Sequence, residues 1–330
     1  MKTKVIRIIS IVMLVILILA LVTLTAGAVA KANLAKQYPA PGQLVDVGGY
    51  KMHINCIGQG SPTVILEAGL GDYSLKWAHV QPEVARSTRV CSYDRAGYGW
   101  SEPSPHPRTA ITEVEELHTL LVNANVEGSY VLVGHSLGGM LVRVYAHNYP
   151  DEVVGMVLVD SVHDEQVTRL PESMLKANQD MAGQARMFVL LSSTGLMALA
   201  PQNIPNPGLP EDAYAQYQAV MATTGGIEVW IDEVNEIEES FAEVRTLSLT
   251  SFGNMPLIVL SRGHWDAIPL ISDADNGQAW DVWQKMQSEL AALSSESKQV
   301  IAEQSGHYIQ IDQPDLVIDA IREMLDAIRK

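Results

Sequence analysis

The chain has 330 residues, of which 47% are hydrophobic and 18% are charged. This length allows one large domain with a sizeable insertion, and the composition is that of a globular rather than a disordered protein. The formal net charge is −16, and because five basic residues precede the first acidic residue, Asp46, the rest of the chain carries −21. Such an acidic surface repels phosphate backbones and excludes nucleic acid as an expected partner.

The first predicted element is a transmembrane helix. Residues 8–30 form an uncharged, mostly apolar run, long enough as a helix to cross the roughly 30 Å hydrocarbon layer. Residues 1–7 are basic, so we expect them in the cytoplasm and the rest of the chain outside the cell. We predict an uncleaved anchor in the cell membrane. The alternative is a cleaved signal peptide and a secreted protein, because the small residues at 26–30 resemble cleavage sites. Residues 31–41 are expected to form a short tether.

From residue 42 onward, short β-rich runs alternate with helical stretches. Two glycines at 48–49 predict a hairpin between the first two strands. The predicted strands are 43–47, 50–57, 63–67, 89–93, 130–133, 155–159, 257–260 and 299–302. The predicted helices between and after them are 112–123, 138–148 and 314–328. Antiparallel opening strands followed by alternating strands and helices indicate an α/β fold with a mostly parallel sheet covered on both faces.

The alternation stops between residues 162 and 250. This segment contains an apolar helical stretch at 187–200 and a mixed one at 211–244, with a proline-rich stretch between them. Because strands resume directly afterwards, we interpret 162–250 as a helical cap inserted into a core formed by 42–161 and 251–330. A second independent domain is the alternative.

The pentapeptide G-H-S-L-G at 134–138 lies between a predicted strand and a predicted helix. In that context the pattern predicts a nucleophile elbow, a tight turn that exposes its serine at the carboxyl edge of the sheet. The turn needs neighbours with almost no side chain, which explains Gly134 and Gly138. Ser136 then lies at the amino end of a helix, whose dipole favours developing negative charge.

With this elbow the chain resembles the α/β-hydrolase family from about residue 42 to its end. Residues 66–71 (LEAGLG) lie where the family has its oxyanion loop, and residues 94–101 (DRAGYGWS) resemble its D-x-x-G-x-G-x-S turn. The S-G-H at 305–307 resembles the G-H that follows the family's last strand. The resemblance implies the α/β-hydrolase fold, with eight mostly parallel strands, helices on both faces and a helical cap. One departure is Ala-Gly at 68–69, where the family often has His-Gly.

The resemblance also implies a role for each matching residue. Ser136 would attack an acyl carbonyl and form an acyl-enzyme, while His307 would take its proton and return it to the leaving group. The backbone N–H groups of Leu137 and Leu70 would stabilise the oxyanion, with Gly71 as the alternative to Leu70.

Two aspartates compete for the acid that orients His307. Asp160 directly follows the strand predicted at 155–159, where some members of the family, including certain lipases, place this acid. Asp266 follows the next strand in a G-x-x-D context, which resembles the commoner placement. However, more residues separate Asp266 from His307 along the chain than is usual in the family, and residues 272–276 look like an inserted loop. We favour Asp160 and keep Asp266 as the alternative.

The chain has two cysteines, Cys56 and Cys91. The resemblance implies that their strands are neighbours, and an exported protein with two cysteines favours a disulfide between them. Two buried free thiols are the alternative. Neither cysteine has metal-ligand spacing, and the sequence lacks H-E-x-x-H, G-x-G-x-x-G and P-loop patterns. We therefore expect no metal and no cofactor.

A serine nucleophile indicates acyl chemistry, whereas family members that open epoxides or displace halide use Asp at this position. We expect a small acyl substrate, most simply a carboxylic ester or lipid, since the apolar stretch 187–200 would suit a greasy pocket. A first alternative is an aminopeptidase of small peptides, which needs a cap acid near the substrate amine. The candidates for that acid are Glu228, Glu233, Glu236, Glu238 and Glu239. A second alternative is a membrane-anchored binding protein on an inactive hydrolase scaffold.

Overall fold

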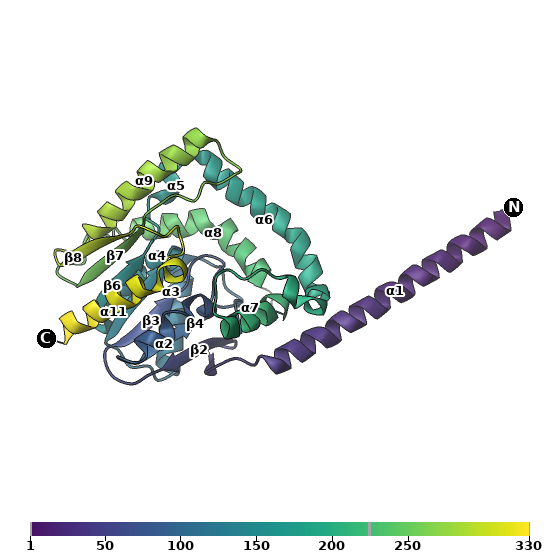
Figure 1. Cartoon of the computed structure of the whole chain (residues 1–330), viewed down its shortest axis with the longest axis horizontal. Coiled ribbons are helices and arrows are strands. Elements are labelled where there is room, and N and C mark those ends of the chain that lie inside the picture. The colour runs from purple at the N-terminus through teal and green to yellow at the C-terminus, as the bar shows by residue number, and fades with distance from the viewer. Residues whose placement is uncertain (1, 224–225, 330) are drawn as a thin grey trace.

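The computed structural model describes residues 2–223 and 226–329 and shows an α/β body from which one long helix projects (Figure 1). The strands are β1 (Gln43–Asp46), β2 (Lys51–Ile57), β3 (Thr63–Glu67), β4 (Val90–Tyr93), β5 (Tyr130–His135), β6 (Val153–Val159), β7 (Leu257–Arg262) and β8 (Ser297–Ala302). The α-helices are α1 (Lys2–Gln37), α2 (Gln81–Val84), α3 (Ala110–Asn123), α4 (Leu137–Asn148), α5 (Gln166–Arg169), α6 (Glu172–Ser193), α7 (Glu211–Thr223), α8 (Gly226–Thr246), α9 (Asp273–Ala291), α10 (Ile309–Asp312) and α11 (Pro314–Ile328). Short 3₁₀ turns are η1 (Ser74–Trp77), η2 (Pro150–Glu152), η3 (Leu196–Leu199) and η4 (Pro201–Asn203).

All eight strands form one sheet in the order β1-β2-β4-β3-β5-β6-β7-β8. The pairs β1–β2 and β2–β4 are antiparallel and the remaining neighbours are parallel. The predicted fold class, a mostly parallel eight-stranded sheet with helices on both faces, is confirmed. The strand order reverses direction around β3, and in open α/β sheets the crevice at such a point, beyond the carboxyl ends of the strands, is where ligands bind.

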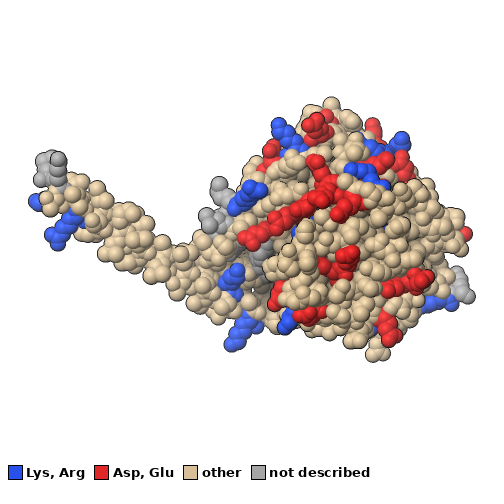
Figure 2. All heavy atoms as spheres, turned by 180° about the vertical axis from the view of Figure 1, so that it is seen from behind, with Lys and Arg blue, Asp and Glu red and all other residues tan. Residues whose placement is uncertain are grey.

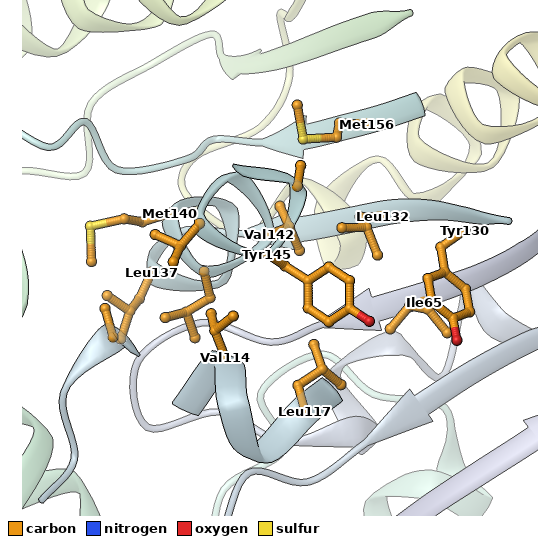
Figure 3. Packing of buried hydrophobic residues seen from close by; sticks show 14 of the residues in the cluster. Ile65, Val114, Leu117, Tyr130, Leu132, Leu137, Met140, Val142, Tyr145 and Met156 are labelled. Carbon is orange, nitrogen blue, oxygen red and sulfur yellow. The ribbon is translucent and has the colours of Figure 1, made fainter. Parts of the chain in front are cut away.

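Alternate residues of the central strands pack into two separate cores. On β5, Tyr130 and Leu132 pack with α3, α4 and α9, while Val131 and Val133 pack with α2 and α11 on the other face. Figure 3 shows the first of these cores, with side chains of α3 and α4 directed at the sheet. A strand buried on both faces needs apolar residues at every position, which is why these strands appear as continuous apolar runs in the sequence.

Two predicted boundaries change in ways that affect the site. The strands β5 and β7 run two residues further than predicted, to His135 and Arg262, because parallel neighbours continue to supply backbone partners there. The prediction of an inserted loop at 272–276 is wrong. Ser272 caps α9, since its Oγ accepts from the Asp275 N–H at 3.1 Å, and the helix begins at Asp273. A capping serine followed by acidic residues in the first turn starts a helix, not a loop.

Between β6 and β7 the chain forms α5 to α8, which we call the cap segment (residues 162–250). Its helix α6 ends at Ser193, so the stretch predicted at 187–200 is helical only in its first half and continues as 3₁₀ turns. The side chains at 187 and 190–192 lie outside the described part of the chain. The stretch predicted at 211–244 divides into α7 and α8, and residues 224–225 between them also lie outside it.

The helix α1 contains the predicted membrane segment. By length and composition it is able to cross a membrane, and its apolar side chains are exposed from Val5 to Val29. Figure 2 shows a long stretch of this helix without charged side chains, between basic residues at its tip and others where it reaches the body. The predicted tether at 31–41 is largely wrong, because α1 continues to Gln37. Residues 31–37 consist mostly of good helix formers (Ala, Leu, Lys and Gln) and contain no glycine or proline, and α1 packs against η3 and α7.

A disulfide joins Cys56 and Cys91, which lie opposite each other on β2 and β4 with their Cα atoms 4.0 Å apart. Replacing both by serine should lower the free energy of unfolding by about 2–4 kcal/mol, since the bond closes a loop with a sequence separation of 35 residues. Denaturant melts of the parent and the double variant measure this difference. A reducing agent should destabilise the parent and leave the variant unchanged, and equal stability of the two chains would contradict the prediction.

Candidate active site

Ser136 occupies the sharp turn between β5 and α4. Its backbone angles are φ 53° and ψ −119°, a combination that non-glycine residues rarely adopt and that is found mainly at functional sites. A Cβ atom on Gly138 would lie 2.6 Å from the carbonyl oxygen of Ala68. The missing side chain therefore lets the turn press against the loop that follows β3.

The imidazole of His307 lies between Ser136 and Asp160. Its Nε2 is 3.0 Å from Ser136 Oγ, and its Nδ1 is 2.6 Å from Asp160 Oδ2. An Nε2 that is to accept the serine proton must be unprotonated, so the ring proton resides on Nδ1 and is donated to Asp160. The three residues come from the elbow, the end of β6 and the loop after β8, which meet at the carboxyl edge of the sheet.

Asp160 is fully buried and accepts hydrogen bonds on both oxygens. Its Oδ1 accepts from Trp283 Nε1 at 2.9 Å and from the Arg262 backbone N–H at 3.1 Å. Its Oδ2 accepts from Arg262 Nε at 2.6 Å as well as from His307. Burial by itself raises the pKa of Asp160, but Arg262 and the hydrogen bonds from His307 and Trp283 outweigh it and lower the pKa to about 2. The carboxylate is therefore ionised at neutral pH, as an acceptor for Nδ1–H must be.

Arg262 and Trp283 were not identified from the sequence. Arg262 Nη2 also lies 2.7 Å from His307 Nδ1, and its guanidinium lies 4.5 Å from the ring centroid of Trp283. A protonated Nδ1 cannot accept from the arginine, so in the reactive tautomer it donates to Asp160 instead. Arg262 follows the apolar residues of β7 just as Asp160 follows those of β6. This position at the end of a strand is the one feature of the sequence that could have indicated Arg262 as a site residue. Trp283 lies in the middle of α9, and no pattern in the sequence around it indicates a contact with the site.

Asp266, the alternative acid, lies elsewhere. Its side chain is 62% exposed, and its Oδ2 accepts from the backbone N–H of His307 at 3.2 Å. The geometry therefore brings Asp160 to the imidazole and places Asp266 against the main chain of the same loop.

His135 supports this loop from within the protein. Its Nε2 donates to the carbonyl oxygen of His307 at 2.9 Å. Burial, together with the nearby His307, lowers the pKa of His135 well below its ordinary value. The ring is therefore neutral and acts on the main chain of His307 rather than on Ser136.

The two segments expected to supply oxyanion donors both face Ser136. A Cβ atom on Gly69 would lie 3.1 Å from Ser136 Cβ, which places the loop after β3 against the serine. Leu70 is the next residue of that loop. Leu137 is the first residue of α4, so its N–H has no carbonyl one turn earlier to bind and remains available to an oxyanion. Gly71 packs instead under the indole of Trp230, since a Cβ atom there would lie 2.8 Å from the ring.

A cavity of about 390 Å³ adjoins the oxyanion loop. Its lining includes Leu70 of the oxyanion loop and Tyr308, the neighbour of His307. The rest of the core side comes from the loop after β3, from η1 and from the turn after β4, at Gly71, Asp72, Tyr73, Lys76, Tyr98 and Gly99. The cap segment contributes Ala185, Phe188, Tyr217, Met221, Gly226, Ile227 and Trp230, which are all uncharged. Within the described part of the chain, the cap side of the cavity is thus aromatic and aliphatic.

The cap glutamates considered as amine ligands lie away from this cavity. Glu233 is buried and forms an ion pair with Arg95, with Arg95 Nε 3.0 Å from its Oε1. Glu228, Glu238 and Glu239 are exposed and Glu236 is half-buried. None of the five belongs to the cavity lining.

A model of the alpha/beta hydrolase fold family matches residues 62–208, which include the oxyanion loop and the elbow. With its eight-stranded sheet, the chain has the α/β-hydrolase fold. It is 28% identical to the uncharacterized protein YqjL of Bacillus subtilis over 81% of this chain and 85% of that protein. The family match and the fold both favour a hydrolase of this superfamily.

Solved structures with the same fold belong to more than one reaction class. A thermophilic esterase from Thermogutta terrifontis is 21% identical and superposes with a TM-score of 0.61, over 88% of this chain and 100% of the esterase. The epoxide hydrolase CorEH is 18% identical with a TM-score of 0.63, over 87% of this chain and 98% of CorEH. At this level of identity the likeness shows the fold alone, so the reaction has to be argued from the site.

Proposed function

We propose that the chain is a serine hydrolase that cleaves carboxylic esters through an acyl-enzyme on Ser136. The single observation that carries the proposal is the position of His307, whose two ring nitrogens lie 3.0 Å from Ser136 Oγ and 2.6 Å from Asp160 Oδ2. A nucleophile, a base and an orienting acid in this arrangement are the parts that acyl transfer requires. We assign these roles to Ser136, His307 and Asp160.

In the proposed reaction His307 Nε2 removes the hydroxyl proton as Ser136 Oγ attacks the ester carbonyl carbon. The negative charge that develops on the carbonyl oxygen is stabilised by the N–H groups of Leu137 and Leu70. The tetrahedral intermediate collapses, and the alcohol leaves with the proton held by His307. Water, activated by the same imidazole, then hydrolyses the acyl-enzyme and restores Ser136.

The cavity supports an ester with an apolar part. Its cap side consists of aromatic and aliphatic side chains, among them Phe188, Tyr217 and Trp230, which favour apolar groups by burying them. An epoxide hydrolase of this fold would need a carboxylate nucleophile, and the elbow holds Ser136. An aminopeptidase would need an acid at the substrate amine, and the cap glutamates weighed for that role are absent from the cavity lining. The esterase among the structural neighbours agrees with the proposal.

We further propose that α1 anchors the hydrolase in the cell membrane with the catalytic body outside. The apolar, exposed length of α1 and the basic residues before it support this orientation, as does a disulfide, which persists in oxidising compartments. The protein should then stay with membranes after alkaline extraction. A mature chain that begins between residues 26 and 31 would show instead that the segment is a cleaved signal peptide.

The full chain, purified in detergent, should hydrolyse p-nitrophenyl esters, with a rate that falls once the acyl group outgrows the cavity of about 390 Å³. A fluorophosphonate probe should label it at Ser136, because the probe reports an activated serine. Turnover of a proline anilide without ester hydrolysis would favour the aminopeptidase. Folded protein that neither reacts with the probe nor turns over any ester would favour a binding protein.

A further inference from the structure

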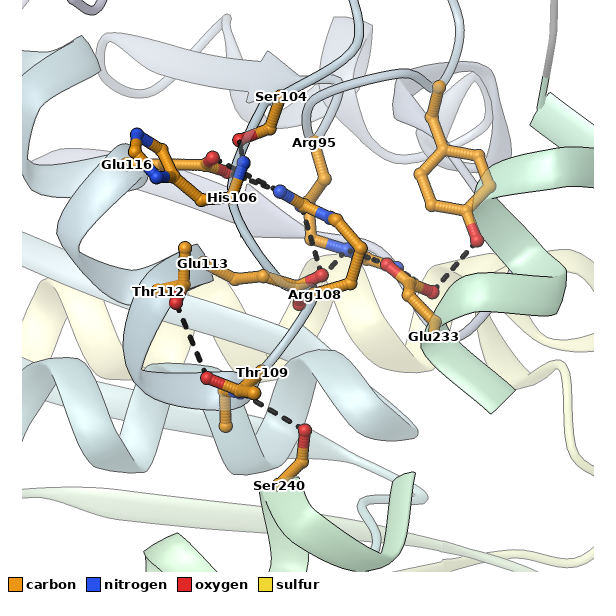
Figure 4. A network of polar contacts seen from close by, with 12 residues as sticks. Arg95, Ser104, His106, Arg108, Thr109, Thr112, Glu113, Glu116, Glu233 and Ser240 are labelled. Atoms are coloured by element: carbon orange, nitrogen blue, oxygen red, sulfur yellow. Dashed lines mark hydrogen bonds and ion pairs between the residues drawn. The ribbon is translucent and has the colours of Figure 1, made fainter. Parts of the chain in front are cut away.

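A second polar centre lies at the junction of the core and the cap segment (Figure 4). At its centre is Arg95, from the turn after β4, with a side chain only 1% exposed. A guanidinium has five N–H donors, and the structure gives every one of them an acceptor. These acceptors are Glu233 Oε1 (3.0 Å from Nε), Glu67 Oε1 (2.9 Å from Nη1), the Ala68 carbonyl (2.8 Å from Nη1), the Gly69 carbonyl (2.9 Å from Nη2) and Glu233 Oε2 (3.2 Å from Nη2).

Two of these bonds hold the main chain of the oxyanion loop. The carbonyl of Gly69 and the N–H of Leu70 belong to one peptide group, which is planar, so in the trans form they point in opposite directions. By binding the Gly69 oxygen on one side, Arg95 fixes the direction of the Leu70 N–H on the other. The positive charge also polarises this amide and makes its N–H a stronger donor. The backbone N–H of Asp72 donates to the same oxygen at 3.1 Å and closes the turn.

The partner that orients Arg95 from the other side belongs to the cap. Glu233 lies on α8, is 1% exposed, and binds Nε and Nη2 of Arg95 with its two oxygens. The hydroxyl of Tyr98 donates to Glu233 Oε2 at 2.8 Å. Burial by itself raises the pKa of Glu233, but Arg95 outweighs it and lowers the pKa, so the carboxylate is ionised.

A second buried carboxyl group, that of Glu113, lies within reach of the same guanidinium, and burial together with the charge of Glu233 raises its pKa well above the ordinary value. Glu113 Oε2 of α3 is 3.4 Å from Arg95 Nε, and it also pairs with Arg108 at 3.0 Å. Without the carboxylate of Glu233, Nε and one hydrogen of Nη2 would lose their acceptors. The guanidinium would then turn towards Glu113, and its Nη2 would leave the Gly69 carbonyl.

We propose that Glu233 is a positioning residue through which the docked cap holds the oxyanion loop in its reactive conformation. The connection runs from Glu233 on α8 to Arg95, to the Gly69 carbonyl and so to the N–H of Leu70. The cap then acts on the rate of the chemical step, in addition to enclosing the substrate. This inference rests on the proposed serine hydrolase and adds a residue that the triad does not contain.

The decisive variant is Glu233→Gln in the full chain, which keeps the size of the side chain and removes its charge. The rate of acylation of Ser136 by a p-nitrophenyl ester in single turnover should fall by about 10- to 100-fold, less than the roughly 10²–10³-fold that complete loss of an oxyanion donor costs. A trifluoromethyl ketone forms an oxyanion adduct with the serine, and its affinity should fall by the same factor. The substrate concentration at half-maximal acylation should stay nearly unchanged, because the cavity lining is intact.

Ser240→Ala is the matched control. Ser240 Oγ accepts from the Ala110 N–H at 3.1 Å and is another buried link between α8 and the core, without contact to Arg95. It should leave both measurements at the parent values. Should Glu233→Gln not fold, Tyr98→Phe removes only the hydroxyl on Glu233 Oε2 and should lower both quantities in the same direction by a smaller factor.

Parent values for the acylation rate and inhibitor affinity in folded Glu233→Gln, or in Tyr98→Phe where that variant replaces it, would overturn the inference. So would an equal loss in Ser240→Ala, because the effect would then belong to cap docking in general. These outcomes leave the parent active and are thus distinct from failure of the proposed function, in which the parent itself would not be acylated and the inference would fall with it.

Discussion

Replacing Ser136 with alanine should lower kcat for ester hydrolysis by about 10⁶-fold, the loss seen when a serine nucleophile is removed from a complete triad. The reason is that no other hydroxyl within the triad geometry can form the acyl-enzyme, while His307 would have only water to activate. Steady-state hydrolysis of the best p-nitrophenyl ester measures the change, and fluorophosphonate labelling should disappear with it.

The control for this substitution is another buried serine. Ser92 lies on β4, and its Oγ donates to Gln81 Oε1 at 2.8 Å. Ser92→Ala should lose some stability and keep its activity per folded molecule. If Ser136→Ala retained more than a trace of ester hydrolysis while folded, another nucleophile would have to carry the reaction.

Replacing Asp160 with asparagine should lower kcat by about 10⁴-fold, because an amide in place of the carboxylate no longer selects the tautomer with the proton on Nδ1. Nδ1 would then be free to accept from Arg262 Nη2, 2.7 Å away, and Nε2 would carry the proton that blocks attack by Ser136. The pH dependence of the parent should also show that Asp160 is not the group lost in mild acid, since its pKa is lowered to about 2.

The same substitution also has a cost in stability that must be measured separately. The ionised Asp160 contributes stability that is fully present above its ordinary pKa of 3.8 and is lost as the pH falls through about 2. That contribution is on the order of 2 kcal/mol, and Asp160→Asn should lack it at neutral pH. Activity is therefore compared per folded molecule, with folding followed by circular dichroism.

Asp266→Asn is the matched comparison for the acid. Its side chain is 62% exposed, lies 3.5 Å from His264 Nδ1 and accepts from the backbone N–H of His307, so kcat should change by no more than about twofold, as for a surface substitution. The reverse result, with Asp266→Asn inactive and Asp160→Asn active, would assign the acid to Asp266 and show that the loop after β7 rearranges in solution.

The architecture was accessible to prediction because each of its features has a local cause. Strands such as β3 and β5 are buried on both faces, so the apolar runs that form them are visible without knowledge of their neighbours. The elbow is visible for a similar reason, since a turn this tight demands Gly134 and Gly138 on either side of Ser136. The errors concern boundaries. Loops were expected at 272–276 and 31–41, but Ser272 caps a helix and the contacts of α1 with the cap segment accompany a helix that continues to Gln37.

The acid of the site illustrates where prediction stops. Asp160 and Asp266 both follow strands that end at the same edge of the sheet, and spacing along the chain does not say which carboxylate approaches His307. The path of the loop after β8 decides it, and with it the burial of Asp160 beneath Trp283 and Arg262. The ion pair between Arg95 and Glu233 spans 138 residues of sequence, and Glu233 looked from the sequence like one more acid on a cap helix.

The sequence by itself therefore determined the α/β fold and indicated Ser136 and His307 as the proposed nucleophile and base, because periodicity, glycine spacing and short motifs act within a few residues. Only the tertiary structure decided which aspartate faces the imidazole, which arginine holds the oxyanion loop and which cap residues line the cavity. These contacts depend on desolvation and on directed hydrogen bonds between segments far apart in the chain. Desolvation and these hydrogen bonds contribute free energy only once the segments are packed together.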